Sequence, residues 1–197
     1  MQTFKEIARE ICNAYNVTLS PEALSLFASV LQPVKLLRGK SPFEKGTVCP
    51  CMYYVKRGLV LQHYKKNGIN VVEHISHEGD MVICIESYFQ QEPSVLEVTM
   101  LEPGTLYGMP YEDMQAISRT SYEICKLLFA ILERSLIVSQ RKADTLRFET
   151  AKQRYIRLVK ENPEIVRRSP LHYVASLLQM KPETLSRVRT QVMEEGL

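Results

Sequence analysis

SPLHYVASLLQMKPETLSRVRTQVMEEGL, residues 169–197, is the stretch that decides the fold of this chain. Its spacing predicts a helix over 171–178, a tight connection at 179–181 and a second helix that begins at Pro182. The small Ala175 lets the two helices approach closely, which predicts a helix-turn-helix. The apolar residues expected to face one another across the turn are Val174, Ala175, Leu178, Leu185 and Val188.

The second helix carries polar side chains suited to DNA. Those that share one face at helical spacing are Glu183, Ser186, Arg187 and Thr190, with Thr184 beside them. Arg187 can donate two hydrogen bonds to guanine N7 and O6, and Glu183 can accept one from a cytosine amino group. The alternative is a solvated helix face on which Glu183 and Arg187 pair with each other at i, i+4.

Further residues are expected at the DNA backbone. Lys181, Thr184 and Arg189 are placed for phosphates, which position a helix without reading the base sequence. His172, at the start of the first helix, is expected to contact a phosphate or to lie on the surface. Residues 141–197 hold 12 Lys+Arg against 7 Asp+Glu, whereas the rest of the chain holds 13 against 15. A basic C-terminal end of this kind favours a nucleic-acid partner, although such an excess also occurs on solvated helices.

Two more helices are predicted upstream of this motif. Residues 150–163, TAKQRYIRLVKENP, form one that ends at Asn162-Pro163. Its expected inward residues are Tyr155, Ile156 and Val159, and its expected outward residues are Arg154, Arg157 and Lys160. The other spans 121–149, where neither Gly nor Pro occurs.

Apolar residues recur along the 121–149 helix at helical and near-heptad spacing. They are Ile124, Leu128, Ile131, Leu132, Leu136 and Val138. This stripe is too long to be covered by the N-terminal part alone, so the same helix of a second copy is the expected cover, in a two-fold homodimer. The alternative is that the stripe packs within its own chain.

Between residues 34 and 109 the pattern changes to short apolar runs bounded by Gly, Pro, Asn or Asp. Such runs predict strands joined by turns, as in a β-sandwich or roll. The segment 65–68, Lys-Lys-Asn-Gly, is the sharpest hairpin signal. Two helices precede the strands: one over the first residues, and one that follows Ser20 as N-cap and has Pro21 at its first position.

The composition limits the classes of function. No apolar run reaches the 18 residues that a membrane span needs, and the N-terminus reads as an amphipathic helix, so a cytoplasmic protein without a membrane partner is expected. No Gly-rich phosphate loop, catalytic carboxylate pair or nucleophile elbow is present, which argues against an enzyme. The cysteines are scattered and are expected to be reduced thiols: Cys12, Cys49, Cys51, Cys84 and Cys125.

Two short pairs have potential metal ligands. They are Cys49 with Cys51, and His74 with His77. Both are more simply explained as structural side chains on or between strands. Cys12 stands alone near the N-terminus, which argues against an iron–sulfur cluster. No metal site is therefore predicted.

The motif P-E-T-L-S-R at 182–187, the helices before it and the Gly-punctuated roll together resemble the Crp/Fnr family of bacterial regulators over nearly the whole chain. YYVKRGLV at 53–60 and the Glu-Gly-Asp turn at 78–80 are similar to the family's roll motifs, and E-T-x-S-R is similar to its recognition helix. The resemblance implies that Glu183, Ser186 and Arg187 contact bases.

The same resemblance implies an α+β fold in three parts. They are an N-terminal double-stranded β-helix, a jelly-roll-like sensor domain resembling cyclic-nucleotide-binding domains, at 1–120, a dimerisation helix at 121–149 and a helix-turn-helix DNA-binding domain at 150–197. The implied function is that of a sequence-specific transcription regulator that binds DNA as a homodimer and contacts RNA polymerase. The alternative is a small-molecule-binding regulatory module whose C-terminal helices make protein contacts, which would not depend on Arg187.

Two departures from the family pattern matter. Members that bind cyclic AMP carry Gly-Glu soon after the Gly-Asp turn and an Arg-Ser or Arg-Thr pair about ten residues later, because the cyclic phosphate needs a countercharge. Here the corresponding positions read Ile83-Cys84 and Glu-Pro-Ser-Val at 92–95, and no basic residue occurs over 79–98. Cyclic AMP is therefore not expected as a ligand, no cofactor is predicted, and another effector stays unidentified. The sequence also stops just past the recognition helix, where most members continue into a β-hairpin wing, so the wing is expected to be reduced or absent, unless the sequence is shortened.

Overall fold

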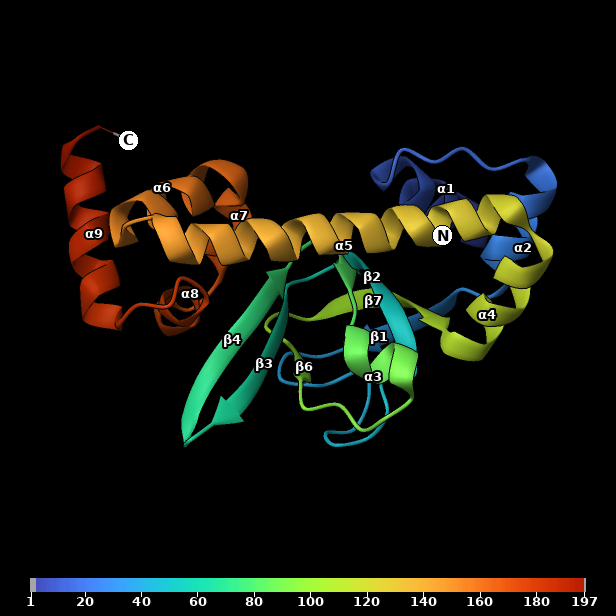
Figure 1. Cartoon of the computed structure of the whole chain (residues 1–197), viewed down its shortest axis with the longest axis horizontal. Helices are drawn as coiled ribbons and strands as arrows, with labels where there is room; N and C mark the ends of the chain where they lie inside the picture. Colours follow the sequence, from blue (N-terminus) through green and yellow to red (C-terminus); the bar gives the residue numbers. More distant parts are fainter. Residues whose placement is uncertain (1–2, 197) are drawn as a thin grey trace.

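The computed structural model describes residues 3–196 as a β-roll with flanking helices, one long helix and a C-terminal group of short helices (Figure 1). The helices that accompany the roll are α1 (Phe4–Ala14), α2 (Pro21–Ser29), α3 (Ile85–Gln90) and α4 (Tyr111–Thr120). The strands are β1 (Gln32–Leu36), β2 (Cys51–Arg57), β3 (Val60–Lys66), β4 (Ile69–Ser76), β5 (Met81–Val82), β6 (Glu97–Met100) and β7 (Gly104–Pro110). The helices that follow are α5 (Tyr122–Phe148), α6 (Ala151–Glu161), α7 (Pro163–Arg168), α8 (Leu171–Leu177) and α9 (Pro182–Glu194).

The roll consists of two antiparallel sheets with strand orders β1-β7-β2-β5 and β4-β3-β6. Apolar side chains from both sheets fill the space between them, among them Val55, Val60 and Leu106. The predicted hairpin is confirmed: β3 pairs with β4, and Asn67 and Gly68 both have the positive φ that a two-residue turn needs. The predicted roll of short strands is therefore confirmed.

Three short helices were not predicted from the sequence. In α3, which interrupts the strands, the N-cap Cys84 makes no side-chain cap hydrogen bond, and the helix ends at Gln91 in a left-handed conformation. The α4 helix likewise has Pro110 as an uncapped N-cap. The third, α7, begins at Pro163, which the sequence pattern marks as the end of the preceding helix. All three lack the capping signal that identifies a helix in a sequence.

The predicted long helix is confirmed as α5, which runs along most of the molecule (Figure 1). The Ser121 side chain accepts a hydrogen bond from the Ile124 backbone and caps its N-terminus. Three of its side chains are fully buried against α1, α2 and α4: Ile124, Leu127 and Ile131. The stripe thus packs partly within its own chain, while other apolar residues of the same helix stay exposed.

The C-terminal helices pack directly on the roll. Leu59, Leu61 and Val72 from the β3–β4 region lie in one buried cluster with residues of α6 to α9. The Ser176 hydroxyl of α8 accepts a hydrogen bond from the Val72 backbone at 3.0 Å and donates one to the Asn70 carbonyl at 3.2 Å. The roll and the C-terminal helices therefore share a single hydrophobic core.

An ion-pair cluster around Arg168 strengthens this contact. The Arg168 guanidinium of α7 lies 2.7 Å from the Glu78 carboxylate and 2.5 Å from the Glu102 carboxylate, both on turns of the roll. Arg168 is mostly buried, so the pairs are less screened by water than exposed ones. No helix among residues 3–196 is both long enough and apolar enough to cross a membrane.

Candidate nucleic-acid interface

The helix-turn-helix predicted from the sequence is confirmed in α8 and α9. The chain turns at Gln179, which adopts a left-handed conformation with φ of 51°. Its backbone N–H donates to the Ser176 carbonyl, and the Met180 N–H donates to the Ala175 carbonyl, each at 3.0 Å. Pro182 then begins α9 at a position where its missing N–H costs nothing. The two helices are fixed relative to each other by this turn and by a common core.

That core contains the apolar residues predicted to meet across the turn. All five are buried, in the cluster that also holds the roll's β3–β4 side chains: Val174, Ala175, Leu178, Leu185 and Val188. Because α9 buries Leu185, Val188 and Val192, its opposite face is turned to solvent. The packing of one face thus determines which side chains the helix presents.

The solvent face of α9 holds the predicted base-contacting residues. Glu183, Ser186, Arg187 and Thr190 are exposed, and Thr184 beside them is half-buried. Over residues 3–196, neither Glu183 nor Arg187 takes part in an ion pair, although their i, i+4 spacing allows one. The Thr190 hydroxyl donates to the Ser186 carbonyl at 3.3 Å. The internal pair expected for a merely solvated face does not form, and both charges are available to a partner.

The residues predicted to contact phosphates lie around the same face. Lys181 and Arg189 are exposed and make no ion pair with any described residue. By contrast, the nearby Lys152 is paired with Glu195 at 2.5 Å. His172 is also exposed, with its ring 4.0 Å from that of Tyr173. The cations left without a local carboxylate therefore cluster at the N-terminal part of α9 and one turn beyond it.

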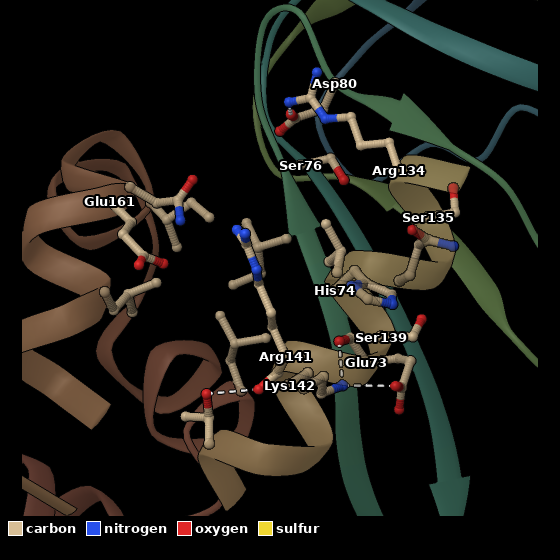
Figure 2. A pocket seen from close by; sticks show the side chains of 18 of the residues that line it. Glu73, His74, Ser76, Asp80, Arg134, Ser135, Ser139, Arg141, Lys142 and Glu161 are labelled. Carbon is tan, nitrogen blue, oxygen red and sulfur yellow. Dashed lines mark hydrogen bonds and ion pairs between the residues drawn. The ribbon is translucent and has the colours of Figure 1, made fainter. Parts of the chain in front are cut away.

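One prediction about α6 is wrong. Arg154 and Arg157, expected to point outward, are half-buried at the junction with the long helix. Arg157 forms an ion pair with Glu149, and Arg154 donates a hydrogen bond to the Glu149 carbonyl at 3.1 Å. The sequence pattern of one helix could not show that the end of α5 lies beside it. Both arginines line a cavity between α5, α6 and the roll (Figure 2).

His74 lines the same cavity from β4. Its burial, together with the nearby Lys142 ammonium, lowers the pKa of the imidazole to about 4. His74 is therefore neutral near pH 7. His77, its predicted partner for a metal, instead places Nδ1 at 3.0 Å from the Glu78 carbonyl.

The cysteines are distributed as buried core residues, apart from one. Cys49, Cys51 and Cys84 lie in the core of the roll, whereas Cys125 on α5 is exposed. Burial raises the pKa of the Cys51 thiol, which keeps it protonated. Among residues 3–196 no three His, Cys, Asp or Glu side chains are grouped to hold a metal ion.

The positions that correspond to a cyclic-phosphate site are also neutral and enclosed. Cys84 precedes α3 and is buried, and Ser94, on the loop that follows the helix, is buried with its hydroxyl bonded to the Leu96 carbonyl at 2.9 Å. Gln62 donates to the Ile83 carbonyl at 3.1 Å across the same region. These polar groups are satisfied by the chain itself.

Comparison with known proteins gives likeness in structure alone. No protein-family model matches the chain, and no curated protein does. The catabolite activator protein of Thermus thermophilus is 24% identical, with a TM-score of 0.57 over 93% of this chain and 88% of that one. FixK2 of Bradyrhizobium japonicum is 17% identical, with a TM-score of 0.70 over 85% and 86%.

A third structure agrees with these two. The c-di-GMP-responsive global regulator CLP of Xanthomonas campestris is 19% identical, with a TM-score of 0.66 over 90% of this chain and 94% of that one. At such identities the likeness concerns the fold. The α+β class is confirmed: the chain has the architecture of these proteins, with a jelly-roll-like roll, a long helix and C-terminal helices.

Proposed function

We propose that this chain is a sequence-specific DNA-binding transcription regulator of the Crp/Fnr type. The observation that carries the proposal is the solvent face of α9, where Glu183 and Arg187 are exposed side by side and pair with no described residue. A buried core on the opposite face holds α9 against α8, so the two side chains are presented on a rigid element. An arginine in this position can contact guanine in the major groove.

The regulator acts as a homodimer through α5. Tyr122, Phe129 and Leu136 are 75%, 67% and 62% exposed and recur every seven residues, which is the repeat of a two-stranded coiled coil. Large apolar side chains in such a row are normally covered. A two-fold dimer presents two copies of α9, and each reads one half of a palindromic site, with the half-sites about one helical turn apart.

The regulator does not respond to cyclic AMP. A cyclic phosphate would meet no cation between residues 79 and 98, and the polar groups of Cys84 and Ser94 are buried. The uncompensated phosphate charge would have to lose its water without gaining a partner, which disfavours binding. As a regulator of transcription the protein works in the cytoplasm, with DNA and RNA polymerase as partners.

The test is selection of binding sites from a random-sequence DNA library at fixed salt, without added nucleotide. We expect the wild-type protein to enrich a palindrome. Arg187→Ala loses the preference at one base position in each half-site, at a cost of about 1–3 kcal/mol.

Arg189→Ala is the matched control, because it removes the same charge from the same helix. It weakens binding to all sequences alike and lowers the slope of log K against log salt by about 1. If no site is enriched, or if both variants behave identically, α9 does not read bases. The regulatory module with protein-contacting helices then becomes the better account.

A further inference from the structure

A cavity of about 360 Å³ lies where the roll, α5 and the C-terminal helices meet (Figure 2). One wall is β4, the second is α5, and the third is formed by α6, α7 and α8. Its apolar lining includes Ile75, Val138, Leu158 and Ile165. A cavity of this volume is large enough for a small organic molecule.

The charged side chains of the cavity are mostly paired. Five cations and three carboxylates line it. Lys142 lies 2.6 Å from Glu73, and Arg134 lies 4.0 Å from Asp80. These pairs neutralise each other and leave a positive excess at the other end of the cavity, towards α6.

Arg141 supplies most of that excess. Its guanidinium makes no hydrogen bond or ion pair with any residue in the described range 3–196. Figure 2 shows it extending from α5 into the space between Glu161 on α6 and His74 on β4. A guanidinium can bind a carboxylate, sulfonate or phosphate with two parallel hydrogen bonds.

Arg154 provides a second unsatisfied donor on the opposite wall. Its Nε is buried and has no hydrogen-bond partner among the described residues, although one terminal nitrogen is bonded to the Glu149 carbonyl. A buried donor without an acceptor is unfavourable. Glu161 is the counterweight, because it lines the cavity without an ion pair and repels an anion that approaches it.

We propose that this cavity binds a small organic anion with an apolar body. The anionic group is held between Arg141 and Arg154, and the apolar body lies against Val138, Ile75 and Leu158. A ligand in this position contacts the roll, the long helix and the C-terminal helices at once. Its binding stabilises the arrangement in which these three parts are docked.

The probe for the test is 8-anilinonaphthalene-1-sulfonate, an aromatic sulfonate whose fluorescence increases in apolar surroundings. Its matched neutral partner is N-phenyl-1-naphthylamine, which has the same rings without the anionic group. We expect the full chain to bind one sulfonate per protomer and to prefer it to the neutral amine. The preference measures the contribution of the anionic group.

The variants separate the cavity from the rest of the surface. Arg141→Gln weakens sulfonate binding about tenfold or more and removes the preference over the amine. Arg147→Gln changes the same charge on the same helix, outside the cavity, and leaves binding unchanged. Glu161→Gln strengthens binding, because it removes a repelling charge. Val138→Trp fills the apolar part and abolishes binding of both probes.

Two results would overturn the proposal. One is equal binding of the sulfonate by Arg141→Gln and Arg147→Gln, and the other is undiminished binding by Val138→Trp. Either would place the dye on the exposed apolar row of α5. Far-ultraviolet circular dichroism of each variant shows that loss of binding is not loss of folding. No DNA is used, so the outcome is independent of the function proposed above.

Discussion

His74 shows how its surroundings change the chemistry of a single side chain. Burial disfavours the charged imidazolium, and the Lys142 ammonium adds repulsion, so the pKa falls to about 4. In an unfolded chain the same imidazole has a pKa near 6.5. Between these two values the unfolded state binds a proton that the folded state refuses.

The folded state is therefore expected to lose stability as the pH falls from about 6.5 to about 4, and the contribution of His74 levels off below that. The loss amounts to at most about 3 kcal/mol. Urea unfolding of wild type and His74→Gln across this range measures it as the difference between the two curves, which cancels the titration of carboxylates. His172→Gln, at an exposed histidine, serves as control. Parallel curves for wild type and His74→Gln would contradict the low pKa.

At this scale the sequence predicted exposure well on the last helix and poorly before it. Glu183 and Arg187 lie on the solvent face because α9 has one neighbour side, which its own 3.6-residue period reveals. Their contact with DNA stays a prediction. Arg154 and Arg157 are turned inward by Glu149, a residue of another helix, and the period of α6 contains no information about that neighbour.

At the scale of elements, α5 is the helix whose outer side is unfinished. Its buried residues face α1, α2 and α4, and the row Tyr122, Phe129 and Leu136 is left to solvent. We expect Leu136→Lys to convert a dimer to a monomer, because it places two charges opposite each other in the seam and removes two apolar contacts of about 1.5–3 kcal/mol each.

Sedimentation equilibrium measures the change against the 22.7 kDa of one chain. Ile137→Lys is the matched control, since Ile137 is an exposed apolar residue of the same helix that lies one position off the seven-residue row. It should leave the dimer intact. A wild-type protein that sediments as a monomer, or a Leu136→Lys variant that stays dimeric, would exclude this seam.

Long elements were easier to predict than short ones. The α5 helix was predictable because 27 residues without Gly or Pro leave few alternatives, and its Ser121 cap is a strong signal. The α3 and α7 helices have six residues each, too few for a periodic pattern, and neither has a side-chain cap. Such helices form because packing in the complete fold stabilises them, and local sequence does not report that packing.

At the scale of the whole molecule, Arg168 joins the C-terminal helices to two turns of the roll. Hydrogen bonds from Arg168 lower the pKa of Glu78 to about 2. The favourable ion pair is thus present above the unfolded value near 4.5 and is lost as the pH falls towards 2. The docking of the two parts is expected to weaken in the same range.

At neutral pH the double variant Glu78→Gln and Glu102→Gln removes both carboxylates from Arg168. We expect faster amide hydrogen exchange in α7, α8 and the β3–β4 hairpin, with the remaining strands unaffected. Glu97→Gln, which breaks the Lys45 ion pair within the roll, is the control and should leave exchange in α7 and α8 unchanged. Unaltered exchange in the double variant would show that the apolar core alone determines docking.

The core shared by the β3–β4 region and the C-terminal helices also bears on how such a protein can evolve. Where two parts are joined by a linker alone, recombination can exchange one of them and leave the other intact. Here a newly acquired set of helices would meet Leu59, Leu61 and Val72 with side chains never selected to fit them. Mutations on the two sides of this contact are therefore inherited as compensating pairs, and the two halves of the gene descend together.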